Sequence, residues 1–263
     1  MHFGFDIATV LLAAFAAGCI DAMVGGGGLI QLPALFAVFP GAAPPYLLGT
    51  SKFAGIFGTA SAVARFASKV HIPWRSLAPL ALLVLIASVC GAVVATIVAP
   101  DVFRPLVPIM LATMLLYMLF RPNLGTEHVP KHFAGSHHVF ATLLVVAIGF
   151  YDGFFGPGTG SLLMFVFVRF YGFDYLHASA CARVLNVATN VSALTYFAIH
   201  GYVYWGLGVA MALCNVAGAT LGTRMALRGG STLVRKIFLV VVSALIVRTA
   251  WTAAHWNLSQ NPL

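Results

Sequence analysis

Two cations and two carboxylates occupy matching places in apolar stretches of the sequence. Lys52 and Arg183 each lie near the start of a long apolar segment, and Asp21 and Asp152 each stand four residues before a glycine-rich interruption. A charge at the centre of a membrane segment costs at least ~2.5–3.5 kcal/mol, so such charges are usually paired or functional. If the cations converge, they form an anion site, where Arg183 gives bidentate contacts and Lys52 a point charge. The alternative is that both side chains snorkel to the membrane surface.

The glycine-rich interruptions predict broken helices whose backbone N–H groups face the same site. Helix N-termini carry partial positive charge, and glycine lets the backbone approach a ligand closely. The alternative is that these glycines only permit tight helix packing. The glycines expected at the site are Gly25, Gly26, Gly27, Gly156 and Gly158.

Polar residues near the cations and the breaks complete the candidate substrate site. They are Thr50, Ser51, Thr59, Thr159, Ser161, Asn186 and Asn190. The two asparagines have an alternative role in hydrogen bonds between helices. The two aspartates have a structural reading, as acceptors of N–H bonds or partners of the cations, and a functional one, as proton carriers. If they pair with Lys52 and Arg183, the empty site is nearly neutral, and protonation frees the cations for an anion.

The composition predicts that lipid is the main solvent of this chain. Of its 263 residues, 61% are apolar and only 8% are charged, whereas soluble domains carry about 25% charged residues. The mean hydropathy is +0.98. These values exclude an ordinary cytosolic enzyme, a nucleic-acid binder and a disordered chain, and the net charge of +8 is better explained by orientation in a membrane.

Long apolar runs predict an all-α integral membrane protein. Two further regions, 7–39 and 139–168, are interrupted by the glycines, and their first arms, 7–20 and 139–151, span about 20 Å against ~30 Å of hydrocarbon. We therefore expect two helical hairpins that dip into the membrane. The predicted crossing segments are 46–67, 76–99, 105–120, 176–199, 201–223 and 231–250.

The sequence aligns with itself at an offset of 131 residues. The shift places Asp21 on Asp152, Lys52 on Arg183 and Trp74 on Trp205, which predicts a duplication. The predicted units are a first membrane repeat at 1–120, a cytoplasmic connecting loop at 121–137 and a second repeat at 138–263. Each repeat would hold one broken-helix hairpin and three transmembrane helices, giving 8–10 membrane segments.

The positions of the cationic loops predict that the two repeats are inverted. One loop of the first repeat carries Lys69 and Arg75, whereas its counterpart at 200–205 has no Lys or Arg. The next loop of the second repeat is the cationic one, with Arg224 and Arg228. Under the positive-inside rule, both termini then lie outside the cell membrane, which we expect to be a bacterial inner membrane.

Inverted repeats with broken helices are typical of secondary transporters that work by alternating access. We therefore expect a small anionic substrate and the lipid bilayer as partners, without nucleic acid, cofactor or metal, and we leave homo-oligomer formation open. An anion channel and an intramembrane enzyme are the alternatives. The enzyme is disfavoured because no nucleophile–base pair or set of metal ligands stands at membrane depth.

Several motifs resemble the sulfite exporter TauE/SafE family, in particular its YfcA-like branch. The resemblance covers nearly the whole chain, although Ser51 stands where the family commonly has Asn, and Arg183 where it commonly has Lys. It implies a multi-pass permease that moves sulfite, sulfonates or related sulfur-containing anions, often outward, and a transporter of a non-sulfur organic anion is the alternative. The motifs are Ile20–Ile30 with Pro33, Gly49–Gly55, Phe150–Ser161 and Ala182–Asn186.

Overall fold

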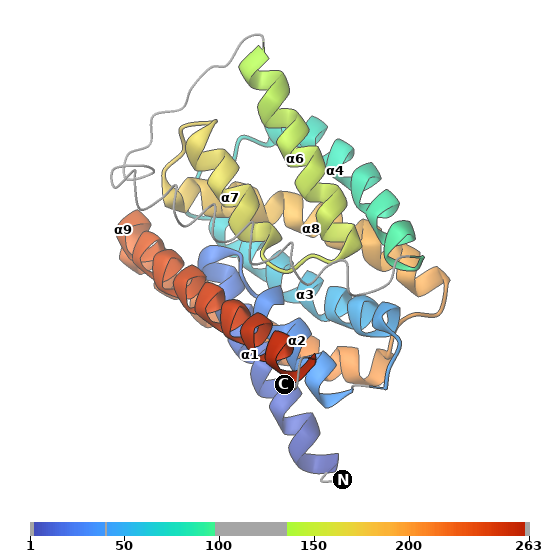
Figure 1. Cartoon of the computed structure of the whole chain (residues 1–263). Helices are drawn as coiled ribbons and strands as arrows, with labels where there is room; N and C mark the ends of the chain where they lie inside the picture. Colours follow the sequence, from blue (N-terminus) through green and yellow to red (C-terminus); the bar gives the residue numbers. More distant parts are fainter. Residues whose placement is uncertain (1–2, 40, 98–135, 261–263) are drawn as a thin grey trace.

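The computed structural model describes residues 3–39, 41–97 and 136–260, in which helices are the only regular elements (Figure 1). The predicted segment 105–120 and residues 121–135 of the predicted connecting loop lie outside the described residues. The helices are α1 (Phe3–Val24), α2 (Gly28–Val38), α3 (Pro44–Ala67), α4 (Trp74–Ala95), α6 (Ser136–Phe154), α7 (Thr159–Arg169), α8 (Tyr175–Ile199) and α9 (Trp205–Gln260).

Three of the described helices contain stretches long and apolar enough to cross a membrane: Ile7–Val24 in α1, Trp74–Ala95 in α4 and Trp205–Gly229 in α9. Their outward faces carry exposed large apolar side chains, such as Leu12 at 70% and Leu82 at 60% exposure. Polar side chains such as Ser88 and Asn215 are buried instead. This distribution, apolar outside and polar inside, suits a protein surrounded by lipid.

Two pairs of helices lie on the outside of the bundle, and one of them joins the two ends of the described chain. α1 packs against α9, α4 packs against α6, and α3 and α8 contact each other between these pairs (Figure 1). α9 also packs against α3, and α4 against α8. The predicted segments 46–67, 76–99 and 176–199 coincide with the helices α3, α4 and α8, and of these three helices α4 is the one long and apolar enough to cross a membrane.

Small residues let the outer helices approach closely at matching positions. A Cβ added to Gly18 of α1 would overlap the carbonyl oxygen of Asn215 in α9. A Cβ added to Gly149 of α6 would lie 2.8 Å from the Cβ of Val84 in α4. The offset of 131 residues carries Gly18 onto Gly149 and Val84 onto Asn215, so the two contacts occupy equivalent places in the sequence.

The breaks after α1 and α6 fall where the glycine-rich runs predict them. Gly25 follows α1 with φ of +76°, and Gly156 and Gly158 precede α7 with φ of +95° and +83°. Side chains other than glycine rarely adopt this left-handed region. The chain therefore turns between α1 and α2 and again between α6 and α7.

The predicted short arm at 7–20 is wrong, because α1 continues past Asp21 to Val24 and is 22 residues long. The carboxylate of Asp21 finds hydrogen-bond partners, so it does not end the helix. At 1.5 Å per residue, α1 is about 33 Å long and matches the hydrocarbon thickness.

The separation of 201–223 from 231–250 is also wrong, because both lie in the single 56-residue helix α9. The residues between them include Gly229 and Gly230 but no proline. Glycine weakens a helix without removing a backbone donor, whereas proline removes one. The helical hydrogen bonds can therefore continue through this stretch.

Candidate functional site

A polar cavity lies between the two breaks, with a volume of about 520 Å³ that includes its opening to solvent. Its wall draws on both breaks and on α3, α8 and α9. Many of the predicted site residues line it: Asp21, Gly25, Gly27, Ser51, Lys52, Thr59, Asp152, Gly156, Gly158, Thr159, Asn186 and Asn190.

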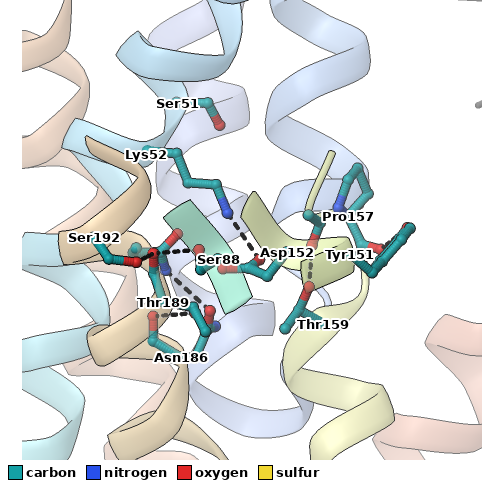
Figure 2. A network of polar contacts seen from close by, with 12 residues as sticks. Ser51, Lys52, Ser88, Tyr151, Asp152, Pro157, Thr159, Asn186, Thr189 and Ser192 are labelled. Carbon is teal, nitrogen blue, oxygen red and sulfur yellow. Dashed lines mark hydrogen bonds and ion pairs between the residues drawn. The ribbon is translucent and has the colours of Figure 1, made fainter. Parts of the chain in front are cut away.

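Lys52 and Asp152 form a buried ion pair at this cavity. Lys52 Nζ lies 2.8 Å from Asp152 Oδ1, and the two residues are only 6% and 2% exposed. Figure 2 shows the Lys52 side chain descending from α3 to this carboxylate. The second carboxylate oxygen, Asp152 Oδ2, is buried and has no hydrogen-bond partner among the described residues. The pair thus keeps one unused acceptor.

The ion pair lies directly against the backbone of Gly156. A Cβ added to Gly156 would lie 2.8 Å from Lys52 Nζ and 2.9 Å from Asp152 Oδ1. The left-handed backbone at Gly156 adds strain for any side chain. Only glycine therefore leaves room for the ammonium and the carboxylate to meet here.

Asp21 has a different environment from Asp152, although the offset makes them equivalent. Its Oδ1 accepts a hydrogen bond from the backbone N–H of Gly27 at 3.3 Å, and its Oδ2 accepts one from the hydroxyl of Thr59 at 3.2 Å. Gly27 is the N-cap of α2, so the carboxylate sits at the positive end of that helix. Both carboxylate oxygens of Asp21 therefore accept hydrogen bonds that stabilise the turn between α1 and α2.

Arg183 is buried beside the cavity but is not among the residues that line it. Its Nη1 donates to the carbonyl and the hydroxyl of Ser179, and its Nη2 donates to the backbone carbonyl of Asp21. The guanidinium also lies over the ring of Phe66, 5.0 Å from its centroid. These contacts fasten α8 to the end of α1.

The two breaks cross each other in close contact. The N–H of Ser161 donates to the carbonyl of Gly25 at 3.1 Å, and its hydroxyl donates to the carbonyl of Val24 at 2.7 Å. A Cβ added to Gly160 would lie 2.6 Å from the Cα of Gly25. The first turns of α2 and α7 therefore begin at the same cavity, and both direct positive helix ends toward it.

Two asparagines and a threonine add polar groups to the wall. Asn190 Nδ2 donates to Asn186 Oδ1 at 3.0 Å, so this hydrogen bond lies within α8 rather than between helices. The hydroxyl of Thr159 donates to the carbonyl of Gly156 at 2.7 Å. Both asparagines line the cavity.

The predicted site residues Gly26, Thr50 and Ser161 do not line the cavity. Thr50 donates to the carbonyl of Tyr46 at 2.7 Å and accepts from the N–H of Tyr204 at 2.9 Å. It therefore joins the start of α3 to the residue before α9.

Gln31 and Asn215 line the cavity but were missed by the sequence reasoning. Gln31 Nε2 donates to the hydroxyl of Ser51 at 2.9 Å, and Asn215 Nδ2 donates to Gln31 Oε1 at 2.9 Å. A signal was present in the sequence, because each is a polar amide inside an apolar run.

The cavity wall carries groups that can bind a small anion: one ammonium group, two helix N-termini, hydroxyls and amides. It also carries the carboxylates of Asp21 and Asp152, and it opens to solvent. No group of three metal-ligating His, Cys, Asp or Glu side chains occurs among the residues that the structure describes.

In the part of the chain that the structure describes, largely apolar helices enclose a polar-lined cavity between two helix breaks, which is typical of an integral membrane protein of the transporter class. The family model for "Sulfite exporter TauE/SafE" matches residues 10–249. The chain belongs to this family.

Curated relatives cover nearly the full length of the chain. A probable membrane transporter protein, ORF9, of Sinorhizobium sp. is 39% identical over 95% of this chain and 94% of its own length. A probable membrane transporter protein of Haemophilus influenzae is 34% identical over 92% and 93%. The probable membrane transporter protein YfcA of Escherichia coli K12 is 34% identical over 95% and 93%. No solved structure matches the chain.

Proposed function

We propose that this protein is a secondary transporter that moves small sulfur-containing oxyanions, such as sulfite or sulfonates, across the cell membrane by alternating access. The observation that carries the proposal is the buried ammonium of Lys52 at a cavity where the N-termini of α2 and α7 meet. Once Lys52 is freed from Asp152, its ammonium and two positive helix ends in a low-dielectric interior attract an anion strongly. The family description supplies the sulfur oxyanion as its class.

Equivalent helix contacts support an inverted pair of repeats behind this mechanism. A Cβ on Gly91 of α4 would overlap the carbonyl oxygen of Phe150 in α6, and one on Gly222 of α9 would overlap that of Cys19 in α1. The offset of 131 exchanges Gly91 with Gly222 and Cys19 with Phe150. Together with the contacts at Gly18 and Gly149, this favours two similar units that rock against each other around the cavity.

The ion pair supplies a route to proton coupling. While Asp152 is ionised, it neutralises Lys52, so the ammonium is a weak attractor for a second anion. A proton on Asp152 would release Lys52, and an incoming oxyanion would become its new counter-ion. Asp21 is the less suitable carrier, because both its oxygens already accept hydrogen bonds.

We place the protein in a bacterial inner membrane with both termini outside. The support is the cationic pair Lys69 and Arg75 between α3 and the first turn of α4, whose counterpart at 200–205 lacks Lys and Arg. Loops rich in Lys and Arg stay on the cytoplasmic side.

The test is uptake of labelled sulfite, sulfoacetate and taurine into proteoliposomes, with and without a pH gradient. We expect saturable uptake of at least one of the three, and acceleration by the same unlabelled anion on the opposite side. Uptake without such exchange would instead identify an anion channel. No uptake of any of the three, in vesicles shown to contain folded protein, would overturn the proposed substrate class.

A further inference from the structure

A chain of hydrogen-bonded amides reaches the cavity next to Lys52. Gln31 of α2 donates through Nε2 to both the carbonyl oxygen and the hydroxyl oxygen of Ser51 in α3, at 3.0 and 2.9 Å. Asn215 of α9 donates through Nδ2 to Gln31 Oε1 at 2.9 Å and to the carbonyl of Ala14 at 3.2 Å. Gln31, Ser51 and Asn215 all line the cavity and are all buried.

This chain fixes which way each amide points. The carbonyl of Ala14 can only accept, so it selects the NH₂ group of Asn215. That group in turn selects Oε1 of Gln31, which leaves the Gln31 NH₂ group facing Ser51. The reverse orientation of Gln31 would set its oxygen against the Ser51 carbonyl oxygen. Both amide hydrogens of Gln31 are therefore committed to Ser51.

The consequence is an uncommitted hydroxyl proton on Ser51. Helical hydroxyls commonly donate back to their own helix, as Thr50 does to Tyr46 at 2.7 Å and Thr195 to Val191 at 2.8 Å. The hydroxyl of Ser51 instead accepts from Gln31, and among the described residues it donates to none. Figure 2 shows Ser51 beside Lys52, one residue earlier on α3.

The fold does not require this polar chain, since its counterpart in the other half is apolar. The offset of 131 residues carries Gln31 to Leu162 and Ser51 to Ala182, and it carries Val84 to Asn215. These three apolar residues are buried as well. The amides and the hydroxyl are thus specific to the side of the cavity that holds Lys52.

We infer that Ser51 and Lys52 form an oxyanion subsite in which Gln31 and Asn215 are positioning residues. This inference rests on the proposed function and deepens it. Lys52 supplies charge, and the Ser51 hydroxyl donates to a second oxygen of the same anion. An oxyanion can accept from the two groups through two different oxygens, whereas chloride must reach both donors with a single atom. We therefore expect the subsite to favour oxyanions over halides.

The test is equilibrium binding of sulfite to the purified full-length protein, followed by proteoliposome uptake. Hydrogen bonds to charged groups are strong enough that Ser51→Ala should weaken sulfite binding about tenfold or more, whereas Ser51→Thr should restore it. Gln31→Leu should weaken binding to a similar extent. In uptake, both should raise KM with Vmax retained. Ser61→Ala is the matched control, because that hydroxyl donates to the carbonyl of Gly58 in the same helix.

The decisive comparison is the double variant Gln31→Leu/Ser51→Ala. If Gln31 acts through Ser51, the double variant binds sulfite no more weakly than Ser51→Ala. The inference is overturned if the losses in sulfite affinity of the two single variants multiply in the double variant. It is also overturned if Ser51→Ala weakens the binding of chloride, measured by competition, as much as it weakens the binding of sulfite. If Gln31→Leu does not fold, Gln31→Met provides the same comparison. Wild-type protein that binds sulfite but does not carry it refutes the transport proposal and leaves the subsite standing, while wild-type protein that binds no oxyanion overturns the subsite.

Discussion

The ammonium of Lys52 and the carboxylate of Asp152 meet at 2.8 Å and connect α3 to α6 in the interior of the molecule. The two residues come from opposite halves of the chain, 100 positions apart in sequence. The ion pair therefore holds the two halves together. At the same time, Asp152 neutralises the Lys52 ammonium that an anionic substrate would use.

Removing one partner should destabilise the protein more than removing both. Lys52→Met leaves a buried, unpaired carboxylate, so we expect unfolding free energy to fall by about 3–5 kcal/mol. The double variant Lys52→Met/Asp152→Leu should recover most of this loss but not uptake. Thermal unfolding in detergent measures the first effect, and Lys69→Met, at an exposed lysine, is the control. A double variant as unstable as Lys52→Met would contradict the pair's role.

Proton coupling should depend on Asp152 and not on Asp21. With a sulfonate as substrate, wild-type uptake should rise as the pH on the substrate side falls, because loss of the carboxylate charge of Asp152 would free Lys52 from its counter-ion. The charged groups that interact with Asp152 are Lys52 on α3 and Asp21 on α1. Asp152→Asn should exchange anions with a flat pH profile.

Asp21→Asn is the matched control for that experiment. It should lower thermal stability, since Asn provides one acceptor oxygen for the two contacts with Gly27 and Thr59, but it should keep the pH profile of uptake. If uptake by Asp152→Asn depends on pH as steeply as uptake by the wild type, the coupling proton is carried by another group.

The crossing of the two breaks should tolerate no added methyl group. In Gly160→Ala the new Cβ would lie 2.6 Å from the Cα of Gly25, and backbone atoms cannot move aside as a side chain can. We expect a loss of at least ~1–3 kcal/mol and no uptake. Gly206→Ala is the control, because nothing lies within 4 Å of its added Cβ. The comparison is read from the yield of monodisperse protein and its melting temperature, and a normal Gly160→Ala protein would refute the crossing.

Arg183 should matter for stability more than for substrate affinity. Arg183→Ala removes the contacts of α8 with Asp21 and Phe66, so we expect a lower melting temperature and less folded protein. The KM of the protein that does fold should change less than threefold. Arg183→Lys should be intermediate, since one ammonium cannot span the partners that a planar guanidinium reaches. A large rise in the KM of Arg183→Ala at normal stability would show that Arg183 belongs to the substrate site.

The sequence predicted which residues come together better than which contacts each of them makes. The offset placed Lys52 on Arg183 and Asp21 on Asp152, and the glycine runs predicted both breaks. The offset could not show that Lys52 binds a carboxylate while Arg183 binds main-chain and hydroxyl oxygens. That difference depends on neighbours such as Ser179, which the alignment of the halves does not weigh.

The predictions that the structure corrects have a common physical cause. A charge in an apolar run predicts the end of a membrane helix at Asp21, but this carboxylate accepts hydrogen bonds from Gly27 and Thr59 and the helix continues. Gln31 and Asn215 are amides inside apolar runs, but the offset of 131 pairs them with Leu162 and Val84, so the repeat does not mark them as site residues. Their partners come from α2, α3 and α9, and only the tertiary arrangement brings these helices together.

The packing of α1 against α9 has a consequence for how the protein is made. α1 leaves the ribosome long before α9, its main neighbour, so α1 must wait in the bilayer with Gly18 facing lipid or an insertion factor. A polypeptide whose synthesis stops before α9 cannot complete this interface. Such products should be short-lived in the cell, and neither half of the chain should accumulate when it is expressed alone.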